Sequence, residues 1–149
     1  MRNFPARSII KFQFNLQKHR YSTHPETILQ YEEDKMSRLS RIVWDESYEE
    51  STFDEETGEF FINRDGKSFN IVLNYLRCNK NPDHIMNLEL TEGEWYFFVQ
   101  DIQFYGIKSL IEVTFKALLG RIDRLKSELE TARRLSIRDS LTIREEMEE

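Results

Sequence analysis

The chain has 149 residues, of which 39% are hydrophobic and 13% aromatic, which is enough apolar material for the core of one domain. Its formal net charge is −6 at pH 7, which argues against general binding of nucleic acid, because such binding needs a basic face for the phosphates. Cys78 is the single cysteine, so no disulfide can form within the chain, and a reducing compartment is expected, the cytoplasm or the nucleus. No apolar run approaches the roughly 18 residues that span a bilayer, so no membrane association is expected.

Residues 1–25 contain basic side chains and no acidic ones, which fits two interpretations. One is a transit peptide, because such peptides are rich in arginine and poor in acids. We favour the other, a β-strand, because Ile10, Phe12 and Phe14 alternate with polar residues as in a half-buried strand. Residues 21–23 then predict a second strand that returns beside the first.

An acidic segment, residues 44–58, follows a short predicted helix. Asp34 is the expected N-cap of that helix, with Met36, Leu39 and Val43 on one face. The acidic segment has weak periodicity and is expected to be a loop with turns. Such a run is usually a solvated loop, the interpretation that we favour, but it also fits a docking surface for a basic partner. The candidate docking residues are Trp44, Asp45, Glu46, Tyr48 and Phe53.

A strand, a tight turn and a helix follow one another closely in the middle of the chain. Residues 59–62, Glu-Phe-Phe-Ile, predict a short buried strand. Asp65 is expected to cap the next helix, and Gly66 to relax the backbone at the junction. Apolar residues then recur at i, i+3, i+4 and i+7, which predicts a helix that ends before Pro82. The apolar residues of this helix are Phe69, Val72, Leu73 and Leu76.

Another helix is predicted from Thr91, because Thr91 and Glu94 have the spacing of a capping box. Gly106 suits a left-handed cap at its end. Residues 95–98, Trp-Tyr-Phe-Phe, cannot all be buried on one helix face, so two of them are expected to face the core. The other two meet either a neighbouring subunit, since aromatic residues are enriched at interface centres, or a second buried side within the chain.

A last helix is predicted from about Lys108, with apolar residues spaced alternately by four and three. Such a seam packs against a sister chain or against a helix of another protein. Residues 115–135 are therefore predicted to form a coiled-coil helix. Ser136 and Asp139 then stand in core positions, so residues 136–149 are expected to be frayed or disordered. The seam residues are Phe115, Leu118, Ile122, Leu125, Leu129 and Ala132.

The order of these elements over residues 9–114 resembles a BTB/POZ domain of the potassium-channel-tetramerisation (T1/KCTD) type. The resemblance is carried by KFQFNLQKHRYSTHPETIL, GEFFINRDGKSFNIVLNYLRCNK and QFYGIKSLIE. It implies an α+β fold with a small sheet and packed helices, here followed by the C-terminal coiled-coil helix. The chain departs from the family at Gln17 and Lys18, where Gly-Gly is usual, and at Asn63, where Asp is frequent.

The resemblance also implies a module for protein–protein interaction that forms homo-oligomers. Free-standing members of the family often recruit the cullin-3 ubiquitin-ligase scaffold, so an adaptor of this kind is our first hypothesis. The alternative is a purely structural scaffold, or a protein dimerised by its coiled coil, with no role in ubiquitination. The sequence leaves the copy number, cullin binding and any client open. The candidate subunit contacts are Arg64, Asp65, Arg77, Tyr96 and Phe97.

No enzymatic activity and no cofactor are expected. The sequence contains no phosphate-binding glycine loop, no HExxH and no GxSxG. Zinc, which some channel relatives bind between subunits, needs clustered Cys and His ligands that this sequence lacks. Cys78 lies near His84, which fits a thiol nucleophile, but we favour a cysteine at a helix end that packs as a small apolar residue.

Overall fold

The computed structural model describes residues 1–16, 18–29 and 31–148. It divides into two compact units, Met1–Thr114 and Phe115–Glu149. The predicted departure from the family turn at Gln17 lies outside the described residues. Among the residues described, no helix combines the length and the apolar character that crossing a membrane requires.

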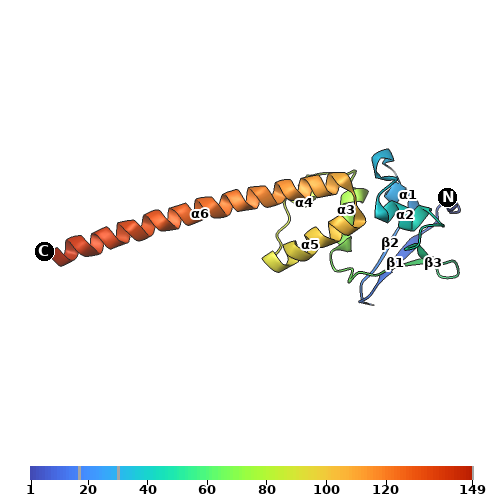
Figure 1. Cartoon of the computed structure of the whole chain (residues 1–149), viewed down its shortest axis with the longest axis horizontal. Coiled ribbons are helices and arrows are strands. Elements are labelled where there is room, and N and C mark those ends of the chain that lie inside the picture. The colour runs from blue at the N-terminus through green and yellow to red at the C-terminus, as the bar shows by residue number, and fades with distance from the viewer. Residues whose placement is uncertain (17, 30, 149) are drawn as a thin grey trace. The chain divides into compact units, whose positions relative to one another are not determined.

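The first unit contains a four-stranded sheet in the order β2-β1-β4-β3 (Figure 1). The outer pairs, β1 with β2 and β3 with β4, are antiparallel, whereas the central pair, β1 with β4, is parallel with Phe12 opposite Phe60. The basic start of the chain is therefore a strand, as its alternation predicted. The strands are β1 (Ile10–Phe14), β2 (Arg20–Thr23), β3 (Thr52–Asp54) and β4 (Glu59–Ile62).

Helices make up most of the remaining chain (Figure 1). The connection from β1 to its parallel neighbour β4 runs through β2, two short helices and a single turn of 3-10 helix, and β3. Three further helices follow β4 before the long last one. The helices are α1 (Pro25–Leu29), η1 (Glu32–Asp34), α2 (Arg38–Trp44), α3 (Phe69–Arg77), α4 (Asp83–Met86), α5 (Glu92–Tyr105) and α6 (Lys108–Glu148).

The core of the first unit joins β1, β4 and α3. Phe12, Phe14 and Phe60 are fully buried, and the predicted apolar stripe of α3 is buried along its whole length. The ring of Phe69 lies 4.9 Å from the rings of both Phe12 and Phe14, centroid to centroid. Strand, turn and helix therefore close on one shared cluster of aromatic side chains, which adds to their stability beyond simple burial.

The turn between β4 and α3 requires glycine at position 66. Gly66 has a φ of +78°, and a Cβ there would lie 2.4 Å from Cγ of Phe14. Its carbonyl oxygen also accepts a hydrogen bond of 3.0 Å from the Tyr21 hydroxyl. The predicted cap at Asp65 is wrong, because α3 begins only at Phe69 and the Asp65 carboxylate instead accepts from the Lys67 backbone N–H at 3.0 Å.

The start of α2 also differs from the prediction. Ser37, not Asp34, is the N-cap, and its hydroxyl accepts from the Ser40 backbone N–H at 3.1 Å. Asp34 lies in η1, where it is buried and pairs with Lys80, a partner from a distant part of the chain. Met36, predicted on the buried face, is 79% exposed because it precedes the helix.

The acidic segment is more ordered than the predicted loop, because it contains β3. Phe53 of β3 stacks on Phe60 of β4, with 4.5 Å between ring centroids. Asp54 and Gly58 close the hairpin, with the Gly58 N–H donating to the Asp54 carbonyl at 2.8 Å. An aromatic contact across the strands thus stabilises a hairpin in a stretch that is otherwise acidic.

The predicted boundaries of α5 are confirmed, with the Thr91–Glu94 capping box at its start and Gly106, at a φ of +73°, as its left-handed C-cap. Helix α6 begins at Lys108 and continues to Glu148, whereas residues 136–149 were expected to be frayed or disordered. Residues 136–148 contain no glycine or proline and are rich in good helix formers, so the helix continues without a seam of apolar side chains.

Candidate functional site

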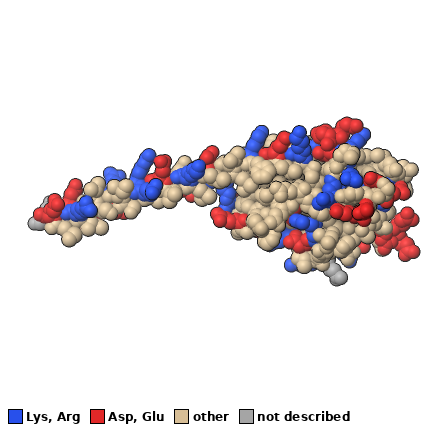
Figure 2. All heavy atoms as spheres, in the orientation of Figure 1, with Lys and Arg blue, Asp and Glu red and all other residues tan. Residues whose placement is uncertain are grey.

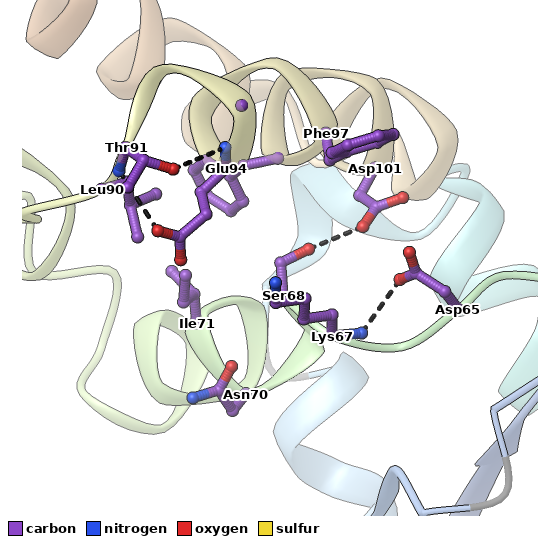
Figure 3. Close-up of a pocket in the computed structure, with 12 residues that line it drawn as sticks. Asp65, Lys67, Ser68, Asn70, Ile71, Leu90, Thr91, Glu94, Phe97 and Asp101 are labelled. Atoms are coloured by element: carbon purple, nitrogen blue, oxygen red, sulfur yellow. Dashed lines mark hydrogen bonds between the residues drawn. The ribbon is translucent and has the colours of Figure 1, made fainter.

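A groove of about 540 Å³ lies between the start of α3 and the first turns of α5 (Figure 3). Ile71, Leu90 and Phe97 contribute apolar side chains to its lining. Figure 3 also shows Ser68 and Asp101 pointing toward each other, with the Ser68 hydroxyl 2.6 Å from Asp101 Oδ2. The groove therefore combines apolar lining residues with fixed polar groups, a composition typical of sites that bind other molecules.

The capping box fixes the wall of the groove at the start of α5. The Glu94 backbone N–H donates to Thr91 Oγ1 at 3.2 Å, and the Thr91 N–H donates to Glu94 Oε1 at 3.2 Å (Figure 3). The hydrogen bond from the Thr91 backbone is the main reason that the pKa of Glu94 is lowered. The carboxylate therefore stays charged at the positive end of the helix dipole.

An ion pair between Arg64 and Asp101 joins the end of β4 to α5. Arg64 Nε and Nη2 lie 3.0 Å and 2.5 Å from Asp101 Oδ1, and the Asp101 side chain is 8% exposed. The Arg64 guanidinium also lies over the ring of Phe104, 5.0 Å from its centroid. Burial raises the pKa of the nearby Tyr105 hydroxyl well above its usual range, and the charge of Asp101 raises it further.

The five candidate subunit contacts have different surroundings. Arg64 is engaged within its own chain, and Asp65 is half-buried in the turn before α3. Arg77 is exposed and donates from Nη2 to the carbonyl of Ser22 in β2. Tyr96 and Phe97 are 62% and 59% exposed and lie edge to face with 5.5 Å between their centroids.

The comparison with known families agrees with this architecture. The family model described as BTB/POZ domain, of the potassium-channel-tetramerisation type, matches residues 12–114. The chain belongs to the BTB/POZ family. No curated protein matches the chain in a comparison of sequences. BTB/POZ domains are modules for protein–protein interaction rather than catalytic domains, so interaction is the function that this surface has to explain.

The candidate docking residues of the BTB/POZ domain are largely engaged with their own chain. Trp44 and Phe53 are half-buried, and the ring of Phe4 lies against both. The Tyr48 ring lies under the guanidinium of Arg41, 4.1 Å from its carbon. Asp45 accepts from the side chain and backbone of Ser47, and these bonds lower its pKa. Glu46 is the exposed one of the five.

Acidic side chains nevertheless gather over the end of the BTB/POZ domain where β3 lies (Figure 2). Asp54, Glu55 and Glu56 are all exposed in the hairpin that precedes β4. The Glu56 backbone N–H donates to the Asp54 carboxylate at 2.9 Å. This hydrogen bond stabilises the charge of Asp54 and offsets part of the repulsion among the three carboxylates. This face therefore attracts basic partners more than acidic ones.

The seam of α6 exposes large apolar side chains, and basic and acidic residues alternate around it (Figure 2). Phe115, Ile122, Leu125 and Leu129 are 43%, 47%, 47% and 61% exposed. Leu118 is half-buried and Ala132 is exposed. The next two core positions of the heptad after Ala132 are Ser136 and Asp139, which are both polar, so the apolar seam ends at Ala132.

Within residues 1–16, 18–29 and 31–148, no cluster of three or more His, Cys, Asp or Glu side chains is placed to hold a metal ion. Cys78 is a free thiol and is exposed, whereas a partly buried position was expected.

Two features of the site were not predicted from the sequence. One is Asp101, which lies on the same helix face as Phe98 and Ile102, so an acidic residue on an apolar stripe was its available signal. The other is the contact of Arg2 and Phe4 with the acidic hairpin, which no local pattern in the sequence indicates.

Proposed function

We propose that this BTB/POZ domain assembles the chain into a homo-oligomer and acts as a KCTD-like adaptor that recruits cullin-3. The observation that carries the proposal is the exposed aromatic pair Tyr96 and Phe97 on α5, of which Phe97 also lines the groove. The core uses the flanking residues Trp95 and Phe98, which are 6% and 0% exposed, so the pair is available to a second subunit. Aromatic side chains of this kind are enriched at the centres of protein interfaces.

Recruitment of cullin-3 is supported by membership of the family rather than by a specific contact. The acidic face around β3 is the proposed docking region, with Glu46, Glu55 and Glu56 as its exposed charges. Arg64 and Asp65 have a supporting role in this proposal, because the Arg64–Asp101 ion pair holds the turn that borders the groove. Both proposed surfaces belong to the first unit.

The mass of the full chain in solution tests the oligomer. We expect a multi-subunit complex by light scattering, and a smaller species for the variant Tyr96→Ser/Phe97→Ser. The matched control is Ile9→Ser/Met36→Ser, which removes two exposed apolar side chains elsewhere (59% and 79% exposed) and should leave the mass unchanged. A monomeric wild type at tens of micromolar would refute assembly, and an unchanged mass for the Tyr96 and Phe97 variant would refute the interface.

Binding to the purified N-terminal region of cullin-3 tests the adaptor role separately. We expect the wild type to bind, and Glu46→Lys/Glu55→Lys to bind more weakly because both acids lie on the acidic face. Glu26→Lys/Glu89→Lys, the same change of charge at two exposed acids outside the acidic segment, is the matched control and should bind like the wild type. An oligomer that does not bind cullin-3 at high micromolar concentration would exclude the adaptor role and leave the scaffold role.

The exposed seam of α6 favours a second candidate, a structural scaffold held together by a coiled coil. Under that alternative, Ile122→Ser/Leu125→Ser would reduce the mass of the complex, and Tyr96→Ser/Phe97→Ser would not. The two pairs of substitutions therefore distinguish an oligomer assembled by the BTB/POZ domain from one assembled by the coiled coil.

A further inference from the structure

Residues 2–5, which we call the strap, lie against an aromatic pocket formed by Trp44, Phe53 and Phe60. Phe4 contacts all three rings, with centroids at 5.2 Å from Trp44, 6.0 Å from Phe53 and 6.4 Å from Phe60. The contacts with Trp44 and Phe53 are edge to face, which is a favoured geometry for aromatic pairs. Phe4 is therefore the apolar anchor of the strap.

Arg2 provides the polar half of the same contact. Its guanidinium carbon lies 4.6 Å from the ring centroid of Phe53 and 5.2 Å from that of Phe60, as in a cation–π interaction. Arg2 Nη2 also donates to Ser51 Oγ at 2.9 Å, and its backbone N–H donates to the Trp44 carbonyl at 2.7 Å. An arginine and a phenylalanine two positions apart thus occupy the pocket together.

The rim of the pocket is acidic. Glu46 and Glu55 line a groove of about 560 Å³ together with the strap. Burial lowers the pKa of Arg2, and the charges of Glu46 and Glu55 act against this effect. The rim therefore favours a basic occupant and disfavours an acidic one.

The contact between the strap and the pocket leaves two buried hydrogen-bond donors without acceptors. Arg2 Nε and the indole Nε1 of Trp44 are buried, and neither has an acceptor within the part of the chain that the structure describes. The backbone of Arg7, which leads from the strap to β1, has a φ of +62°, a left-handed conformation that is unfavourable for a residue other than glycine. The unsatisfied donors and the strained backbone at Arg7 both make the bound state of the strap less stable, so they favour its release from the pocket.

We infer that the aromatic pocket is a docking site for an extended segment of a partner protein that carries an arginine two residues before an aromatic residue. The strap is the resident occupant that this segment displaces. The chemistry of the ligand follows from the strap, since a guanidinium stacks on Phe53 and an aromatic ring inserts beside Trp44. The inference goes beyond the proposed function, because it requires neither the oligomer nor cullin-3.

A labelled peptide with the sequence of residues 1–8, MRNFPARS, tests the pocket by fluorescence anisotropy on the full chain. We expect the strap variant Arg2→Ser/Phe4→Ser to bind this peptide at least about tenfold more tightly than the wild type, because no tethered competitor remains. The matched control is Arg7→Ser/Ile9→Ser, which removes an arginine and an apolar residue outside the pocket. It should bind as weakly as the wild type.

Two further comparisons test whether the binding is specific to the anchors and to the pocket. The peptide MSNSPARS, which lacks both anchors, should not bind the strap variant. Adding Phe53→Ser to the strap variant should abolish binding of MRNFPARS, because the platform for the guanidinium is lost. The peptide should also raise the melting temperature of the strap variant and not that of the wild type, since a ligand stabilises the state that it binds.

Each contrary result overturns the inference. Equal binding of the peptide to the wild type and to the strap variant would show that the strap does not compete for the pocket. No binding to a strap variant with a native circular dichroism spectrum would show that the pocket is purely structural. A smaller mass of the strap variant in light scattering, without peptide binding, would show that the pocket holds the strap of a sister chain. If the double variant does not fold, Phe4→Ser alone serves in the same assay.

Discussion

A buried ion pair between Lys80 and Asp34 ties the turn after α3 to η1. Lys80 Nζ lies 2.5 Å from Asp34 Oδ2 and 3.1 Å from Glu33 Oε1. The ammonium group also lies 4.0 Å from the ring centroid of Tyr31. The side chains of Lys80 and Asp34 are 9% and 3% exposed, so both charges have lost most of their water. Removing one of them leaves the other buried without a counter-charge.

The substitution Lys80→Met tests this arrangement. Methionine keeps a long apolar stem and a Cβ, so the left-handed backbone at this position (φ +55°) is strained to the same extent in both proteins. Breaking a buried ion pair by removing one partner typically costs about 3–5 kcal/mol of unfolding free energy. For a domain of this size, about 3 kcal/mol corresponds to a fall in melting temperature on the order of 10 °C.

Urea unfolding monitored by tryptophan fluorescence measures the effect, because Trp44 and Trp95 both lie in the first unit. The matched control is Lys35→Met, which breaks the Lys35–Glu32 pair, 2.7 Å long but with side chains 46% and 82% exposed. Exposed pairs contribute about 1 kcal/mol or less, so the control should be close to the wild type. Equal losses for Lys80→Met and Lys35→Met would refute the role of burial.

The pH dependence of the same variants gives an independent check. Burial alone lowers the pKa of Lys80, but its hydrogen bonds with Asp34 and Glu33 outweigh this effect, and the pKa is raised overall. The ion pair therefore stabilises the folded state fully below the unfolded pKa of lysine, about 10.4, and this contribution is lost as pH rises through the higher folded pKa. The difference in urea midpoint between the wild type and Lys80→Met should shrink above about pH 10.4. A difference that stays constant to higher pH would contradict the assignment.

Two further changes test the turn at Gly66 and the start of α5 by urea unfolding. Gly66→Ala should lower the unfolding free energy by about 2 kcal/mol or more, because the new Cβ meets Phe14 and the φ is positive. The control is Gly93→Ala, which should be neutral or slightly stabilising because no atom lies within 4 Å of the new Cβ. A small loss for Gly66→Ala would show that the turn relaxes. Thr91→Ala should cost about 1 kcal/mol through loss of the N-cap, and no loss would show that Thr91 Oγ1 is replaceable by water.

Local patterns in the sequence predicted the elements that local forces determine. The apolar stripe from Phe69 to Leu76 predicted a buried helix face, and Thr91 with Glu94 predicted the capping box that the structure contains. Gly106 predicted the left-handed end of α5. Each of these features depends on residues within one or two turns of each other, so spacing alone is sufficient to identify it.

Features that depend on distant residues were not predictable in the same way. Asp34 has the residue type of an N-cap, but its partner Lys80 lies 46 positions away and decides its role. The Arg64–Asp101 pair and the contact of Phe4 with Phe53 are likewise formed by residues far apart in the chain. Helix propensity and periodicity carry no information about such pairs, because they arise only when the elements pack.

The length of the heptad seam indicates which of the two units holds the proposed oligomer together. The heptad seam of α6 is continuous from Phe115 to Ala132, less than the three to four heptads over which a coiled coil is usually sustained. Ser136 and Asp139 then occupy the next two core positions, and the exposed apolar residues Leu135, Ile137 and Leu141 lie outside the core positions of the heptad. We therefore expect α6 to follow an assembly that the BTB/POZ domain has already formed. We expect Tyr96→Ser/Phe97→Ser to reduce the mass of the complex in light scattering. At the same protein concentration, Ile122→Ser/Leu125→Ser should leave that mass unchanged. The reverse result would assign the assembly to α6.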